Sequence, residues 1–127
     1  MAAPQVTPLV EVRRDGGFIV SLGNGHQSFE TGTLNAANSA AAAGLVVGKL
    51  TADGTLAAYN PANADGSQVP VGVVYGVHRT SAAAQPCVYV ARQAEVNGTE
   101  LVWFAGATAP QIAAGSIALS AIGVLVR

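Results

Sequence analysis

Short runs of β-prone hydrophobic residues recur along this chain, and turn-forming dipeptides separate them. Five Asp-Gly or Asn-Gly pairs begin at positions 15, 24, 53, 65 and 97. Pairs of this kind favour the positive φ angles of tight turns. The β-prone runs are residues 18–22, 28–31, 45–50, 71–75, 88–90 and 101–104. Short strands punctuated by turns predict a mainly β fold with largely antiparallel pairing.

Two segments depart from this pattern. Residues 36–43 are rich in alanine and predict either a helical turn or a loose loop. Residues 109–122 carry widely spaced aliphatic side chains among alanines, and Pro110 stands where a first-turn proline is tolerated. We therefore expect a short helix over 109–122 that Gly123 terminates, followed by a last strand at 124–126.

The N-terminal stretch, roughly residues 1–16, has no clear hydrophobic periodicity and contains Pro4 and Pro8. Chain termini of this kind are usually mobile unless something ties them down. The rest of the chain shows no internal repeat and no linker, and its length suits one compact domain. The sequence thus predicts a single β-rich domain preceded by a flexible N-terminal arm.

The composition is unusually neutral for a globular domain. Hydrophobic residues make up 50% of the chain and charged residues only 10%, against about 25% charged in typical soluble domains. Much of the hydrophobic excess is alanine. Such a surface suits a protein whose faces are covered by copies of itself or by a lattice.

Charge and hydropathy argue against two classes of partner. The net charge is -1, and the six Lys and Arg residues are scattered rather than gathered in the basic stripe that nucleic-acid binding requires. No uninterrupted apolar stretch approaches the ~18 residues of a membrane span, and the N-terminus lacks the features of a signal peptide. We expect neither nucleic acid nor a membrane as partner, and synthesis in the cytoplasm.

Residues that could carry chemistry are few and isolated. Cys87 lies in an apolar strand, which indicates a buried hydrophobic residue rather than a nucleophile. His26 and His78 are too far apart in sequence to form a metal motif. Glu95 and Glu100 flank a predicted turn and are expected to be exposed. The sequence therefore predicts no catalytic residues, no metal site and no cofactor.

Laid in order, several segments resemble the lambda-type phage head decoration proteins. They include Gly-Phe-Ile-Val-Ser at 17–21, Gly-Leu-Val-Val-Gly-Lys-Leu at 44–50, Glu-Val-Asn at 95–97 and Gly-Val-Leu-Val-Arg at 123–127. The further matching segments are residues 24–25, 28–30, 59–61, 65–67, 72–74, 92–94, 100–103 and 118–122. Many relatives have Ser-Arg-Glu where this chain has Ser28, Phe29 and Glu30, so an apolar contact is expected at Phe29.

The resemblance implies a β-clip-like fold with short helices that assembles as a homotrimer. Such trimers bind the major capsid protein of the expanded head at three-fold and quasi-three-fold positions, on the outer surface of the virion capsid. There they resist the internal pressure of packaged DNA. The family's N-terminal arm adds strands to capsid-protein segments, which needs main-chain hydrogen bonds rather than charge.

Applied to this chain, the resemblance predicts a capsid-docking arm over residues 1–30 and a decoration domain over residues 31–127. The predicted capsid-binding residues are Phe18, Ile19, Val20, Ser21, Ser28, Phe29 and Glu30. Two other hypotheses remain open. The chain could be a tail or fibre component with similar short strands, or a small enzyme in which Cys87 or the pair Glu95 and Glu100 would have to act.

Overall fold

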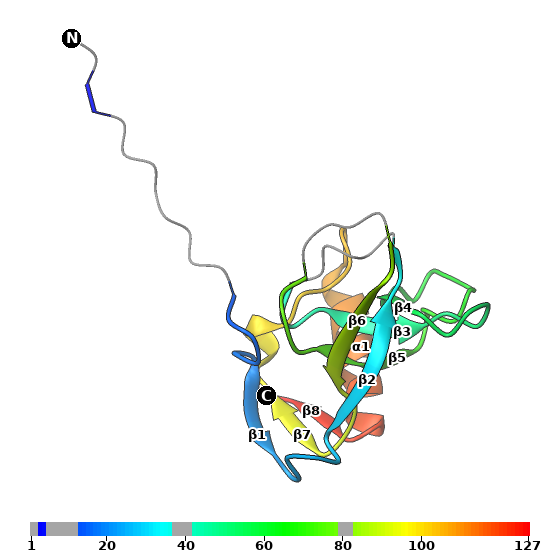
Figure 1. Cartoon of the computed structure of the whole chain (residues 1–127). Helices are drawn as coiled ribbons and strands as arrows, with labels where there is room; N and C mark the ends of the chain where they lie inside the picture. Colours follow the sequence, from blue (N-terminus) through cyan, green and yellow to red (C-terminus); the bar gives the residue numbers. More distant parts are fainter. Residues whose placement is uncertain (1–2, 5–12, 37–41, 79–82) are drawn as a thin grey trace.

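The computed structural model describes residues 3–4, 13–36, 42–78 and 83–127, and shows a mainly β domain (Figure 1). This confirms the predicted fold class. The strands are β1 (Ile19–Leu22), β2 (Phe29–Leu34), β3 (Val46–Lys49), β4 (Leu56–Ala58), β5 (Pro70–Val74), β6 (Gln85–Val90), β7 (Ala94–Val96) and β8 (Val124–Val126). A short 3-10 helix, η2 (Gly98–Glu100), follows β7, and the α-helix α1 (Ala109–Ala121) precedes β8.

Five of the strands close into a small barrel in the order β2-β4-β3-β5-β6. All neighbouring pairs are antiparallel except β2 and β4, which run parallel and are joined at Leu34 and Leu56. A barrel of this size has room only for side chains. Its filling is a cluster of buried residues: Leu34, Leu45, Val47, Leu56, Val74, Cys87 and Tyr89.

Glycine is required where two barrel strands pass close together. A Cβ atom at Gly72 of β5 would lie 2.3 Å from the carbonyl oxygen of Val90 and 2.6 Å from the ring of Tyr89. Real Cβ atoms do not make contacts this short, so any side chain at position 72 would push β5 away from β6. This glycine therefore lets the barrel close around the Tyr89 ring.

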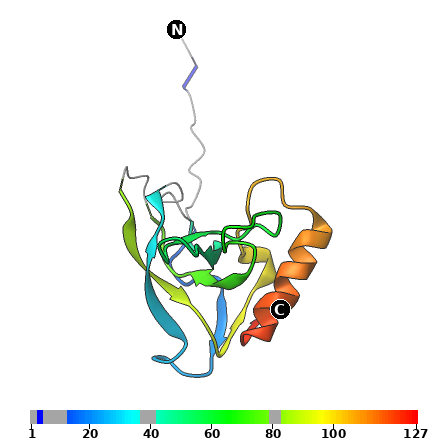
Figure 2. The same ribbon diagram turned by 90° about the vertical axis from the view of Figure 1, so that its right-hand side faces the viewer.

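The remaining three strands form an open sheet in the order β1-β7-β8, which lies beside the barrel together with α1 (Figure 2). β1 runs antiparallel to β7, and β8 runs parallel to it. A second buried cluster joins this sheet, the helix and the outer surface of the barrel. Its members are Phe18, Val46, Tyr59, Val73, Val90, Ala94, Val96, Leu101, Leu119 and Val124.

The C-terminal helix has strong sequence signals at both ends. Thr108 caps its N-terminus in a capping box with Gln111, with Pro110 in the first turn, and Gly123 follows its end with φ +91°. Gly115 lowers helix propensity, but a Cβ there would lie 2.5 Å from the Trp103 ring. The glycine is thus the place where Trp103 packs against the helix. The predicted helix and the last strand are both confirmed.

One predicted strand is absent from the structure, and two observed strands were not predicted. The strand expected over 101–104 is wrong: only Val102 forms an isolated bridge with Leu45, since Leu101 enters the core and Trp103 packs on α1. Strands β4 and β7 were not predicted, because each has only three residues and neither forms a hydrophobic run that stands out in the sequence. Of the ambiguous segment 36–43, residues 37–41 lie outside the described residues.

Candidate functional site

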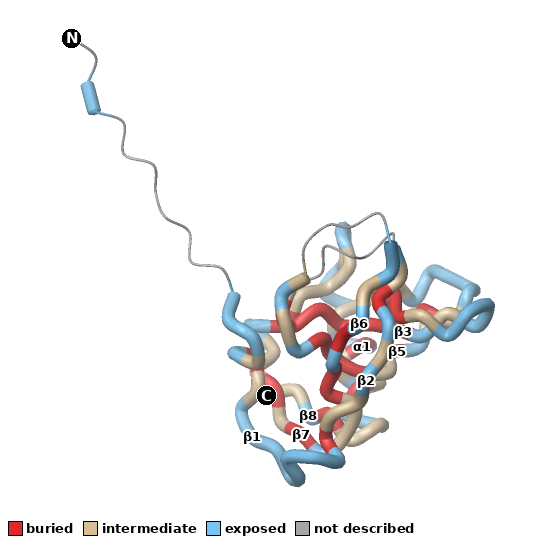
Figure 3. The backbone as a smooth tube through the Cα atoms, in the orientation of Figure 1, coloured by how far each residue is buried: buried red, intermediate tan, exposed pale blue. Residues whose placement is uncertain are grey.

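β1 forms one edge of the open sheet, and no strand of the described residues pairs with its other side. Ile19 pairs with Val96 and Ser21 with Glu95, so Val20 is the extra residue of a β-bulge. The side chains of Val20 and Leu22 are 56% and 36% exposed. Figure 3 shows this strand as exposed over most of its length. An edge of this kind leaves backbone groups free to pair with another chain.

A shallow hollow of about 220 Å³ adjoins the end of β1. Its wall includes Ser21 and Leu22 of β1, Glu95 of β7 and Leu125 of β8. Gln93 also lines the hollow and adopts φ 51°, a left-handed conformation that is unfavourable for a residue with a side chain. Backbone strain of this kind is retained only where surrounding contacts enforce it.

Those contacts are visible around Gln93. Its carbonyl oxygen accepts hydrogen bonds from the Gly23 backbone N–H at 2.6 Å and from Ser28 Oγ at 3.1 Å. The next residue, Ala94, donates its N–H to the carbonyl of Gly123. The turn after β1 is therefore fastened to the start of β7, which holds the edge strand in place.

The seven residues predicted to bind a capsid fall into separate environments. Val20 and Ser21 lie together on the exposed edge strand, and Ile19 beside them is half-buried. Phe18 is only 2% exposed and belongs to the core between sheet and barrel. Ser28 is fully buried. The side chains of Phe18 and Ser28 thus face the protein's own interior in this structure.

Phe29 and Glu30 lie on β2, which is one of the five strands of the closed barrel. Phe29 makes the apolar contact expected from its sequence, an edge-to-face packing against Tyr75 with ring centroids 5.6 Å apart. Glu30 forms an ion pair with Arg92. The arm boundary expected after residue 30 falls within β2, and the described residues 13–30 contact the rest of the domain.

The chain matches a known protein family over most of its length. Residues 8–124 match the family model for bacteriophage lambda head decoration protein D. The chain belongs to this family. Its members are structural proteins of phage heads, which gives the chain a role in capsid decoration. The search of individual curated proteins gives no match. None of the helices in the described residues is long and apolar enough to cross a membrane.

The enzyme hypothesis would require Cys87, or the pair Glu95 and Glu100, to act. Cys87 is buried in the barrel, where burial raises the pKa of its thiol and disfavours the reactive thiolate. Glu95 is paired with Arg127 on the outer face of the open sheet, at 3.3 Å. Glu100 is paired with Arg13 beside η2, at 2.9 Å. Each carboxylate therefore has its own cationic partner.

The histidines and turn aspartates have local roles. His26 lies exposed in the turn that Asn24 caps, and the His78 ring is 3.0 Å from the Gly76 carbonyl. Asp65 accepts hydrogen bonds from the hydroxyl and backbone N–H of Ser67, which lower the pKa of its carboxyl. Among the residues that the structure describes, no three His, Cys, Asp or Glu side chains are grouped to hold a metal ion.

Proposed function

We propose that this protein binds as a homotrimer to the expanded phage head, at three-fold and quasi-three-fold positions on its outer surface. Bound trimers would brace neighbouring capsid subunits against the internal pressure of packaged DNA. The observation that carries this proposal is the family match over residues 8–124. The low charge of the chain supports it, because surfaces that meet copies of the chain or a lattice need few charges.

The proposed docking element is the exposed edge of β1 together with the chain that precedes it. An extended segment of the major capsid protein would add to β1 as a further strand, through main-chain hydrogen bonds. The bulged Val20 and the neighbouring Ser21 would lie along that new pairing. The hollow at the end of β1 would receive a side chain of the added strand.

The fold narrows the capsid-binding hypothesis. Phe18, Ser28, Phe29 and Glu30 would act indirectly, because they fasten β1 and β2 to the domain. The arm itself would be residues 1–12, most of which lie outside the described residues, and it would end just before Arg13, whose contacts with Glu100 are described. Ordering each residue of such an arm costs about 1–2 kcal/mol, so new backbone pairing and apolar contacts with the capsid must offset that cost.

A deletion of residues 1–12 tests the docking proposal. Removing residues 1–30 would be uninformative, because that deletion takes away β1 and the buried Phe18 and should unfold the domain. The shorter deletion leaves every described strand intact. We expect it to preserve the trimer, measured by light scattering, and to weaken decoration of purified expanded heads severely.

Electron microscopy of decorated heads provides the second measurement. Density at three-fold and quasi-three-fold positions, continuous with capsid segments beside β1, is the expected result. A deletion variant that decorates heads as tightly as the full chain would refute docking through residues 1–12. A full-length chain that binds tails but not heads would refute the decoration role itself.

A further inference from the structure

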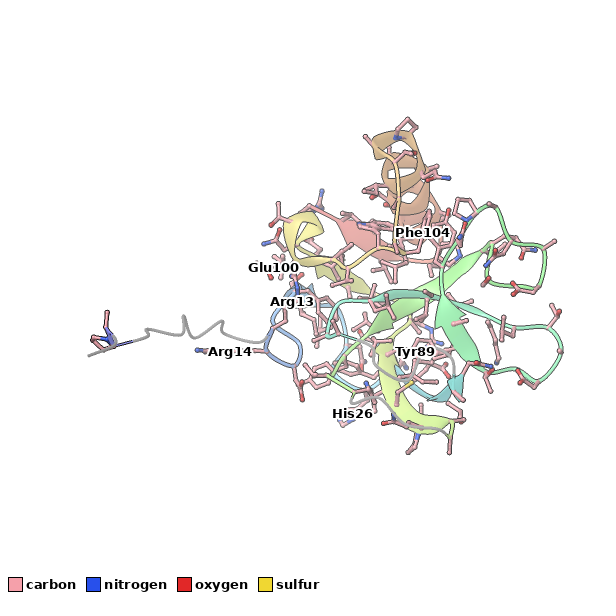
Figure 4. All side chains as sticks on the ribbon, turned by 90° about the horizontal axis from the view of Figure 1, so that it is seen from above. Arg13, Arg14, His26, Tyr89, Glu100 and Phe104 are labelled. Carbon is pink, nitrogen blue, oxygen red and sulfur yellow. The ribbon has the colours of Figure 1, made fainter. Side chains whose placement is uncertain are left out.

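The chain just before β1 is held on two sides by specific contacts. On one side, Arg13 Nη1 donates hydrogen bonds to Glu100 Oε2 at 2.9 Å and to the Glu100 carbonyl oxygen at 2.8 Å. Glu100 ends the 3-10 helix that follows β7. Figure 4 shows the side chains of Arg13 and Glu100 next to each other, with Arg14 directed away from the domain.

On the other side, Asp15 and Gly16 are bound to the segment that follows β5. Asp15 Oδ1 accepts the backbone N–H of Val77 at 3.0 Å, and the Gly16 N–H donates to the Tyr75 carbonyl at 2.8 Å. Gly16 has φ +67°, and a Cβ there would lie 2.6 Å from the Tyr75 ring. The turn thus packs on that ring, and a residue with a side chain would be strained at position 16 and would displace the ring.

We propose that Arg13 and Asp15 are positioning residues, which fix where the chain leaves the domain and direct residues 1–12 towards the capsid. This inference rests on the proposed docking through those residues. We call the contacts of Arg13 with Glu100 and of Asp15 with Val77 the arm clamp.

The energetics favour positioning over a stabilising role. Both side chains of the Arg13–Glu100 pair are more than two-fifths exposed, at 41% and 48%. Ion pairs with this exposure contribute little to folding stability. The same contact removes rotational freedom at the base of the arm before binding, and preorganisation of this kind increases affinity because less freedom is lost in the complex.

Three copies multiply the effect. In a trimer, each arm that docks raises the local concentration of the other two near their own sites. A loss of about three-fold per arm, typical of an exposed ion pair, becomes about 30-fold for a trimer that binds through all three arms. A small local contact would then have a readily measurable effect on decoration.

Charge reversal with rescue is the decisive test. Arg13→Glu and Glu100→Arg should each weaken binding of the full-length protein to expanded heads by about 30-fold, with melting temperatures close to that of the parent. The double variant Arg13→Glu/Glu100→Arg should recover most of the affinity, because it restores the ion pair in reversed order. Failure of the double variant to recover would overturn the inference.

Two further pairs of variants provide controls. Lys49→Glu makes the same change of charge on β3 of the barrel, outside the arm clamp, and should weaken binding much less than Arg13→Glu; an equal or larger loss would show that net charge, not the contact with Glu100, governs binding. Asp15→Ala removes the acceptor for Val77 and should weaken binding, whereas Asp15→Asn keeps an acceptor oxygen and should retain it. Equal binding by these two variants would contradict a role for that hydrogen bond.

The deletion and the substitutions together distinguish failure of the arm clamp from failure of docking through residues 1–12. If deletion of residues 1–12 leaves decoration unchanged, docking through the arm is refuted. If that deletion abolishes decoration while Arg13→Glu and Asp15→Ala both bind like the parent, docking stands and the arm clamp is refuted.

Discussion

The closed barrel and the open sheet solve the problem of strand edges in opposite ways. In the barrel, β2 meets both β4 and β6, so each of its five strands has two neighbours. In the open sheet, β1 has β7 on one side only among the described residues. Closure removes the unpaired backbone groups that invite another chain, and an open edge keeps them.

The two regions also differ in what their side chains do. The barrel interior is filled by its own residues, and its interior cluster includes Leu34 and Leu56 at 0% and 1% exposure. The open sheet buries only its inner face, and its outer face presents Val20 and Leu125. The surface suited to a partner strand is therefore in the sheet. Phe18 is the residue at which the edge strand joins the common core.

Phe18→Ala should have the largest effect, because it separates the two regions. We expect a loss of about 3–5 kcal/mol in the free energy of unfolding, typical of removing a buried phenylalanine. Phe18→Asp should unfold the domain, because it places a charge in the buried core. Val20→Asp, two positions along and exposed, is the matched control. Near-parental urea stability of Phe18→Asp would show that β1 does not depend on this anchor.

A pair of leucine variants compares the regions directly. Leu56→Ala in the barrel should cost about 2–5 kcal/mol through lost burial and the cavity left behind. Leu125→Ala on the outer face of the sheet should change stability by less than about 0.5 kcal/mol. Urea denaturation of both variants measures the difference, and equal losses would contradict the placement of Leu56 in the core and of Leu125 on the surface.

Cys87→Ser is expected to have a smaller effect within the barrel. The buried hydroxyl would lack a full set of partners and should cost about 1 kcal/mol, while decoration stays intact. Because burial raises the pKa of the thiol, iodoacetamide should label Cys87 slowly in the native protein and rapidly in urea. A well-folded Cys87→Ser variant that fails to decorate heads would reveal a functional role for this residue.

Val20→Lys should have the smallest effect on stability and a clear effect on binding. Its side chain is exposed, so the free energy of unfolding should change by less than about 0.5 kcal/mol. A lysine on an edge strand discourages pairing with another strand, so decoration should weaken. Val88→Lys, at a similarly exposed position on β6 of the closed barrel, should leave binding unchanged. The opposite ranking of these two variants would place the docking surface on the barrel.

Much of the fold could be predicted because its signals are local. The capping residues and Pro110 mark the start of α1, and the Asp-Gly and Asn-Gly pairs fall where strands end or turn. What sequence could not reveal was long-range. Barrel closure depends on β4 meeting β2 through a single parallel pair, and no three-residue run announces such a partner. The segment at 101–104 has strand-like residues, but tertiary packing of Trp103 decides its course.

In the candidate site, too, local features could be predicted from the sequence and long-range contacts could not. The β-prone residues of the edge strand were visible in the sequence, but their hydrophobicity alone did not tell which faced inwards. Phe18 and Val20 look equally suited to a partner, and only the bulge and the core separate their roles. The contact of Arg13 with Glu100 joins residues 87 positions apart. No local pattern encodes such a pair, although an Arg-Arg-Asp run just before a strand marks where to look.

The way the barrel closes also governs how fast the protein can form. β2 must find β6 across about half of the chain, since Glu30 and Arg92, just after β6, are 62 positions apart. Folding dominated by such non-local pairing takes roughly milliseconds to seconds, because long loops must close before their contacts form. Until then, the barrel strands have edges with unpaired backbone groups. A protein that folds on this timescale depends on short strands to keep those edges from pairing with other chains.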